Sequence, residues 1–132
     1  MADTLHFAFW MLLGSKPKRG CVYELLDPRD GGIRYVGNTT HNPRERVLHL
    51  LDKARNGSQS PLGRGIRRML ALGITPTVAV RAIVADAAEA LRLGDALTGL
   101  RWAQGCAEWN KDKASINRAE AALVCRLKRS QP

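Results

Sequence analysis

Residues 21–37 read CVYELLDPRDGGIRYVG, and this stretch decides the fold. Its two ends, CVYELLD at 21–27 and IRYVG at 33–37, are rich in β-branched and aromatic residues, which is typical of strands. The segment between them, PRDGG at 28–32, has the proline, aspartate and glycine content of a turn. The stretch therefore predicts a β-hairpin that carries Tyr23 on its first strand and Tyr35 on its second.

The chain beyond the hairpin alternates between helical and strand-like patterns of apolar residues. The predicted order is helix, helix, strand, helix, helix, over residues 43–55, 61–72, 76–84, 86–104 and 114–128. The third of these helices begins with Asp86 and Glu89 at the spacing of a capping box. Its apolar spacing predicts a buried face made of Ala90, Leu93, Leu97 and Leu100.

Together these elements predict an α/β (α+β) domain with a small, three-stranded, mostly antiparallel sheet flanked by helices. We divide the chain into an N-terminal apolar segment with a basic linker (1–19), the main domain (20–110) and a basic C-terminal helix (111–132). The apolar run LHFAFWMLL at 5–13 is too short to span a bilayer, and we expect it to pack on the domain. Its aromatic residues make it the expected interface if the protein is a weak dimer rather than a monomer.

The composition limits the class of protein. A chain of 132 residues is one domain by length, and its 45% hydrophobic and 25% charged residues are ordinary for a globular protein. The charge is less ordinary, because the net charge is +9 and 15 of the 21 basic residues are arginine. Arginine binds phosphate in a bidentate manner, so the surplus favours a phosphate-bearing partner such as DNA. A charge that serves only solubility is the alternative.

The cysteines indicate a reducing environment. Cys21, Cys106 and Cys125 are odd in number and widely spaced, and no C-x-x-C motif occurs. This pattern favours neither a disulfide framework nor a zinc site. We therefore expect free thiols in a cytoplasmic, reducing compartment, with no membrane association.

The hairpin and the helix after it carry a family resemblance. CVY at 21–23 and YVG at 35–37 resemble the two halves of the GIY-YIG nuclease signature. The following helix carries Arg46 and His49, where that family usually has an arginine and then a histidine about one turn later. The resemblance covers roughly residues 21–110. It implies the same sheet architecture and the activity of a metal-dependent DNA endonuclease, which hydrolyses phosphodiester bonds.

The resemblance also implies roles for individual side chains. Tyr23 is expected to activate the attacking water, and Tyr35 to orient water or metal-bound groups. Arg46 is expected to hold and neutralise the scissile phosphate, and His49 to hydrogen-bond within this cluster. These four residues are the predicted catalytic set.

The metal site implied by the resemblance is incomplete. The family holds one divalent ion, Mg²⁺ or Mn²⁺, on a glutamate about 15 or 16 residues before a late asparagine, here Asn110. That position falls on Gly94 or Asp95, and Gly94 gives the better match. Because glycine has no ligand atom, Asp95 is the nearest carboxylate, although helical spacing predicts that it faces solvent. Gly37 and Asn110 are expected to shape the site.

Helix geometry separates the two arginines that could hold the phosphate. At about 100° per residue, Arg46, His49 and Lys53 lie together on one side of their helix, whereas Arg44 projects elsewhere. We therefore prefer Arg46 as the phosphate ligand. Its spacing of three residues to His49 differs from the four more common in the family, which turns His49 by about 100°.

Further basic residues on the two consecutive helices are predicted to follow the DNA backbone. They are Arg44, Lys53, Arg64, Arg67 and Arg68. A solvated helix face is the alternative for the last three. For the whole chain, the alternatives to an active endonuclease are a catalytically inactive DNA-binding member of the same fold, and a structural or protein-interaction module.

Overall fold

The computed structural model describes residues 19–129, apart from the side chains of residues 113–115, 119, 122, 123 and 126. The predicted N-terminal apolar segment, with its expected packing and interface role, lies outside the described residues. Within them, no helix is long and apolar enough to cross a membrane. All three cysteines are free thiols.

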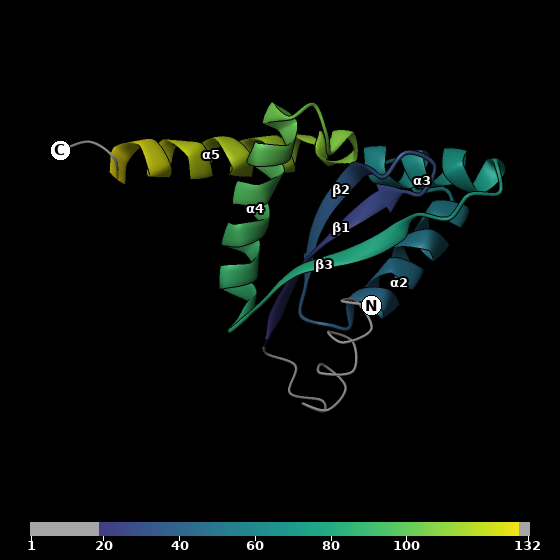
Figure 1. Ribbon diagram of the computed structural model, residues 1–132, viewed down its shortest axis with the longest axis horizontal. Helices are drawn as coiled ribbons and strands as arrows, with labels where there is room; N and C mark the ends of the chain where they lie inside the picture. Colours follow the sequence, from purple (N-terminus) through teal and green to yellow (C-terminus); the bar gives the residue numbers. More distant parts are fainter. Residues whose placement is uncertain (1–18, 130–132) are drawn as a thin grey trace.

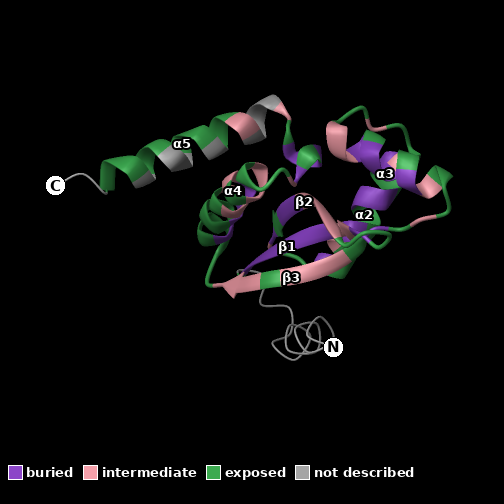
Figure 2. Ribbon diagram, turned by 45° about the horizontal axis from the view of Figure 1, so that its top comes forward, coloured by how far each residue is buried: buried purple, intermediate pink, exposed green. Residues whose placement is uncertain are grey.

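Three antiparallel strands form the sheet, which confirms the predicted fold class. They are β1 (Gly20–Asp27), β2 (Gly32–Thr39) and β3 (Thr77–Val84), in the order β2-β1-β3. The hairpin turn closes where the backbone N–H of Gly31 donates to the Asp27 carbonyl over 2.8 Å. Gly31 has a φ of 69°, a left-handed conformation that favours glycine. In this order β1 is the central strand, and Figure 2 shows it buried along almost its whole length.

The helices lie at the predicted places, within one or two residues at each end. They are α2 (Pro43–Arg55), α3 (Pro61–Ala71), α4 (Ala87–Ala103) and α5 (Lys113–Arg129), with a short 3₁₀ turn, η1 (Glu108–Asn110), that the sequence did not predict. Figure 1 shows α4 on one side of the sheet, α2 and α3 on the other, and α5 projecting away from the body.

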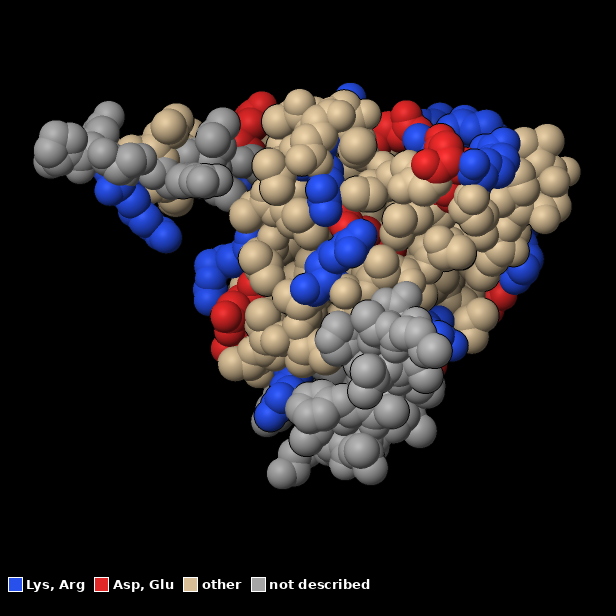
Figure 3. Space-filling model, in the orientation of Figure 1, with Lys and Arg blue, Asp and Glu red and all other residues tan. Residues whose placement is uncertain are grey.

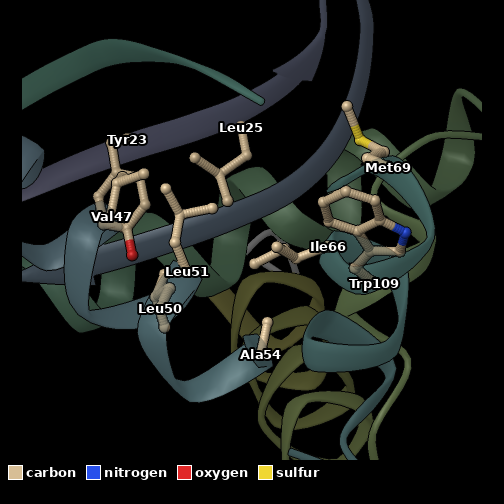
Figure 4. Packing of buried hydrophobic residues seen from close by; sticks show 9 residues of the cluster. All are labelled: Tyr23, Leu25, Val47, Leu50, Leu51, Ala54, Ile66, Met69 and Trp109. Carbon is tan, nitrogen blue, oxygen red and sulfur yellow. The ribbon is translucent and has the colours of Figure 1, made fainter. Parts of the chain in front are cut away.

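The larger hydrophobic core lies between the sheet and helices α2 and α3. Tyr23 and Leu25 project from β1 toward Leu51 of α2, with Ile66 and Trp109 nearby (Figure 4). The remaining buried members of this cluster are Val47, Leu50, Ala54 and Met69. Val47, Leu50, Leu51 and Ala54 form one apolar side of α2, and all four are buried.

The opposite face of the sheet is packed differently. Its buried apolar cluster is small and contains Val22 and Val36 from the sheet, with Ala90 of α4 and Ala107. Beside it Glu24, which is 0% exposed, is bound by two arginines, Arg81 of β3 and Arg101 of α4. This face therefore combines small side chains with a buried carboxylate that is paired on both of its oxygens.

The buried face predicted for α4 was right only in part. Ala90 is buried and Leu97 is partly buried against the smaller cluster, but Leu93 and Leu100 are 40% and 52% exposed. Gly94 and Thr98 complete the buried row with Ala90, spaced four apart. These small side chains let α4 lie close to the sheet. Because protein interiors are tightly packed, the short distance leaves no room for a row of leucine side chains between the helix and the sheet.

Candidate active site

The hairpin brings the two signature tyrosines together. Tyr23 on β1 is paired with Gly37 on β2, and Tyr35 on β2 with Leu25. The two tyrosine rings lie on the same face, with centroids 6.3 Å apart and planes tilted by 50°. A Cβ atom at residue 37 would overlap the Tyr23 ring, so this pairing requires glycine at that position.

Arg46 connects the buried tyrosine to the surface. Tyr23 is only 1% exposed, and burial, together with the neighbouring Tyr35, raises the pKa of its hydroxyl. Arg46 lowers that pKa in part, through its charge and through a side-chain hydrogen bond to Tyr23. The arginine is half-buried on α2. It therefore touches the core tyrosine and also reaches an open cleft.

Tyr35 has a more mixed electrostatic environment. Burial is the main cause of the raised pKa of its hydroxyl. Arg46 and Arg118 lower that pKa, and Asp112 raises it. Both tyrosines therefore remain neutral near pH 7, and their hydroxyls can donate and accept hydrogen bonds with water or a phosphate oxygen.

A cleft of about 220 Å³ opens beside Tyr35 and Arg46. Its other lining residues come from α2, from the loop after it and from the start of α3: Leu50, Lys53, Ser58, Ser60, Leu62 and Gly63. The cleft thus has two cations, three hydroxyl groups and an apolar floor. Such a surface suits a phosphate carried on a sugar.

Asn110 fixes the strand that carries Tyr35. Its side chain is 4% exposed, accepts a hydrogen bond from the Val36 N–H over 2.7 Å and donates one to the Val36 carbonyl over 2.8 Å. The Ala107 N–H also donates to the Ile33 carbonyl. Because β2 is an edge strand, these bonds satisfy backbone groups that a neighbouring strand would otherwise bind. Asn110 therefore holds the Tyr35–Gly37 segment in place.

The structure separates His49 from the other predicted catalytic residues. His49 is exposed, and the lining of the cleft within the described residues does not include it. The residue one turn after Arg46 that does face the cleft is Leu50. The three-residue spacing explains this result, because it turns His49 about 60° to one side of Arg46, whereas Leu50 lies about 40° to the other side, which is the side of the cleft.

The predicted DNA-binding residues have different surroundings. Lys53 lines the cleft, whereas Arg67 donates to the backbone carbonyls of Ala54 and Ser58. Arg68 lines a separate pocket at the turn of the hairpin, and Arg44 and Arg64 are exposed. On the face drawn in Figure 3, Lys and Arg side chains stand in separate groups.

The predicted metal-ligand position, residue 94, lies on α4 beside Asn38 of β2. Gly94 is buried on α4, and the nearest atom to a Cβ placed there is the Nδ2 of Asn38, at 3.4 Å. Asp95 does not face solvent as predicted, because its side chain is 17% exposed and its Oδ1 lies 3.2 Å from the Nε of Arg118 on α5. Within the described residues, no group of three His, Cys, Asp or Glu side chains could hold a metal ion.

Comparison with models of protein families, with curated proteins and with solved structures finds no match. The case for a site therefore rests on this chain's own residues.

Sequence reasoning missed the hydroxyl-bearing part of the cleft. Ser60 is the N-cap of α3, where its side chain accepts from the Gly63 N–H, and Pro61 follows it. The Ser-Pro pair that begins the helix was a readable capping signal. The approach of Asp112 and Arg118 to Tyr35 had no such signal, since both follow η1 in the chain and depend on how α5 is placed.

Proposed function

We propose that this chain is a GIY-YIG-type DNA endonuclease domain, which binds and hydrolyses a phosphodiester in the cleft beside Tyr35. The observation that carries this proposal is the position of Arg46. It lies beside the buried Tyr23, whose pKa it lowers, and lines the same cleft as Tyr35. Tyr35 and Arg46 thus meet at one opening, with Tyr23 buried behind them.

The chemistry follows from these contacts. Arg46 can bind two oxygens of a phosphate and offset the negative charge that grows during hydrolysis. Arg46 lies close enough to Tyr23 to lower the pKa of its hydroxyl, so the guanidinium is already placed at the cleft beside the tyrosines. Tyr35, whose hydroxyl is neutral, orients the attacking water by hydrogen bonding rather than acting as a preformed base. Removing Arg46 should therefore remove both charge stabilisation and positioning.

The described residues do not fit the metal ion that the resemblance implies. Gly94 offers no ligand atom, and the Asp95 carboxylate is paired with Arg118. Asn38, an amide, is the side chain beside Gly94. We therefore derive no step through Mg²⁺ or Mn²⁺.

This misfit supports a second candidate function, a DNA-binding member of the same fold that does not cut. The cleft and its cations would remain useful for binding a phosphate, because Arg46 and Lys53 do not depend on residue 94. In that case a carboxylate restored at residue 94 would restore cleavage. A Cβ atom at residue 94 meets Asn38 at 3.4 Å, which is ordinary van der Waals contact, so the backbone there accepts a side chain's first carbon.

The test is cleavage of a supercoiled plasmid and a branched DNA with Mg²⁺ or Mn²⁺. Wild type, Arg46→Ala and Gly94→Glu are compared, with Arg55→Ala as the matched control. Arg55 lies on the same helix, is exposed and pairs with Asp52. We expect wild type and Arg55→Ala to cut, and Arg46→Ala to be inactive while it keeps its fold.

The other outcomes separate the two candidates. If only Gly94→Glu cuts, the cleft is assigned correctly and the chain is a disabled nuclease. If neither wild type nor Gly94→Glu cuts but both bind DNA in a salt-dependent way, the binding function stands alone. Equal cleavage by wild type and Arg46→Ala would refute the assignment of the site.

A further inference from the structure

The outer end of the cleft is built from the loop that joins α2 to α3. Lys53, in the last turn of α2, lines it from one side, and Ser58 and Ser60 line it from the other. The two serine Oγ atoms lie 3.1 Å apart. Together these residues place one ammonium group and two hydroxyl groups around the same opening.

This loop is held rigidly in place. The Arg67 guanidinium donates to the carbonyls of Ala54 and Ser58, over 3.0 and 2.5 Å. Gly63 completes the packing, because a Cβ atom at that position would meet the Ser58 side chain. The hydroxyl groups are therefore positioned before any ligand arrives, which reduces the entropic cost of binding.

The charge at this end suits an anion. Among the described residues, none that lines the cleft is acidic, and the first turn of α3 has no acidic residue. The nearby carboxylate of Asp52 pairs with Arg55 over 3.3 Å. Lys53 thus adds a second positive charge to that of Arg46 in the cleft.

The side chains of Arg46 and Lys53 are close enough to bind two neighbouring phosphates of one ligand. Lys53 follows Arg46 by seven residues, two helical turns or about 10.5 Å along the axis, so both project from the same side of α2. Long, flexible side chains can shorten this separation toward that of consecutive phosphates. The apolar floor between them, Leu50 and Leu62, offers a surface for the sugar that links two phosphates.

We infer that Lys53, Ser58 and Ser60 form a second phosphate site, which holds the phosphate next to the one bound at Arg46. The inference rests on the proposed function, because it takes the cleft to be where a DNA strand binds. The expected ligand is a DNA strand that places two consecutive phosphates in the cleft.

The test compares dinucleotides that differ by one phosphate. TpT has a single bridging phosphate, whereas pTpT and TpTp add one at either end. Binding to the full-length chain is measured by ¹H–¹⁵N chemical-shift titration at several salt concentrations. With wild type, one of the two longer ligands should bind more tightly than TpT by about tenfold, the usual value of a hydrogen-bonded charge pair.

Lys53→Gln should abolish this gain, so that TpT and the longer ligand bind with similar affinity. Ser58→Ala, which changes no charge, should reduce the gain in part. Arg55→Gln is the matched control, because it removes one positive charge from the same turn of α2 outside the cleft. Ser60 is left unchanged because it caps α3, and thermal unfolding checks that each variant is folded.

The outcomes separate failure of the second site from failure of the proposed function. If TpT binding is unaffected by Arg46→Ala, the proposed function fails. If TpT depends on Arg46 but neither added phosphate improves binding, only the second site is refuted. An equal loss of the gain in Lys53→Gln and Arg55→Gln also refutes it, because general screening then explains the effect.

Discussion

The two faces of the sheet differ in the size and the charge of the side chains buried against them. The face under α2 and α3 holds large apolar side chains and opens into the cleft at Tyr35 and Arg46. The face under α4 holds small side chains beside Glu24, whose carboxylate is buried between two arginines. The tyrosine and arginine part of the candidate site lies on the first face, and residue 94 on the second.

Changes at the two places therefore meet different neighbours. A Cβ atom at residue 94 meets Asn38 on β2, not the tyrosines.

The largest expected effect is on stability, and it distinguishes a leucine on α2 from a leucine on α4. Leu51 is 5% exposed in the core under α2, and Leu100 is 52% exposed on α4. Leu51→Ala should reduce the free energy of unfolding by about 3 kcal/mol, through lost burial and the cavity left behind. Leu100→Ala should change it by about 0.5 kcal/mol or less. Urea denaturation followed by circular dichroism measures both.

A large loss for Leu100→Ala would contradict the arrangement of α4. It would mean that the leucines predicted from helical spacing do face a core. Unchanged m-values in both variants would show that the comparison concerns stability alone.

The same contrast explains how far the sequence predicted the fold. The strands and helices were placed within one or two residues, because turn residues, caps and apolar spacing mark their ends. The buried face of α4 was predicted only in part, because spacing arguments follow the largest apolar residues. Gly94 and Thr98 are buried for a tertiary reason, the close approach of the helix to β1 and β2. Glu24 was not foreseen either, since Arg81 and Arg101 are distant in sequence.

Two glycines should respond to alanine with opposite signs. Gly37→Ala places a methyl group inside the Tyr23 ring, which should cost about 1–3 kcal/mol of stability. It should also displace the Tyr23 hydroxyl from Arg46. Gly94→Ala meets only Asn38, at 3.4 Å or more, in mid-helix. There the substitution should stabilise the fold by about 0.5–1 kcal/mol. Thermal unfolding of the two variants gives the signs.

Destabilisation by Gly94→Ala would show that α4 lies closer to β2 than described here. Tolerance of Gly37→Ala would remove the packing reason for glycine in the YVG segment. Both variants replace glycine by alanine and so lower the entropy of the unfolded chain by the same amount. A difference between them therefore comes from contacts in the folded state.

The candidate site was predictable only in part, because local sequence patterns do not reveal contacts between distant parts of the chain. Tyr23, Tyr35 and Arg46 come from adjacent elements, so strand pairing and helix phase suffice to bring them together. His49 was included on the family's usual order, but its spacing turns it away from the cleft. Ser58 belongs to a loop whose path depends on Arg67 and Gly63, which local patterns do not reveal.

A smaller, pH-dependent effect is expected at Asp27, which is 1% exposed near α3. Hydrogen bonds from Arg29, and a further one from Arg34, hold the pKa of its carboxyl well below its usual value of 3.8. Its stabilising contribution is present above that unfolded value and is lost as pH falls toward the folded pKa. Asp27→Asn should therefore be less stable at pH 7, with a free energy of unfolding that falls less steeply in acid.

Denaturant unfolding between about pH 2 and pH 7 measures this slope. Asp52→Asn, on the exposed surface of α2, controls for the loss of one negative charge. Parallel pH profiles for wild type and Asp27→Asn would show that the arginine pair does not act on Asp27 in the folded state.

The smallest effect is kinetic and compares a thiol on β1 with one on α5. Burial raises the pKa of the Cys21 thiol to about 12, and Cys125 is exposed. Because the thiolate is the reactive form, Cys21 should react with a thiol reagent at pH 8 only when the protein unfolds, whereas Cys125 should react at once. Mass spectrometry of the labelled chain, with Cys125→Ser as control, assigns each site. Rapid labelling of Cys21 in the folded protein would mean that β1 opens locally, and the tyrosine face would then be the less rigid of the two.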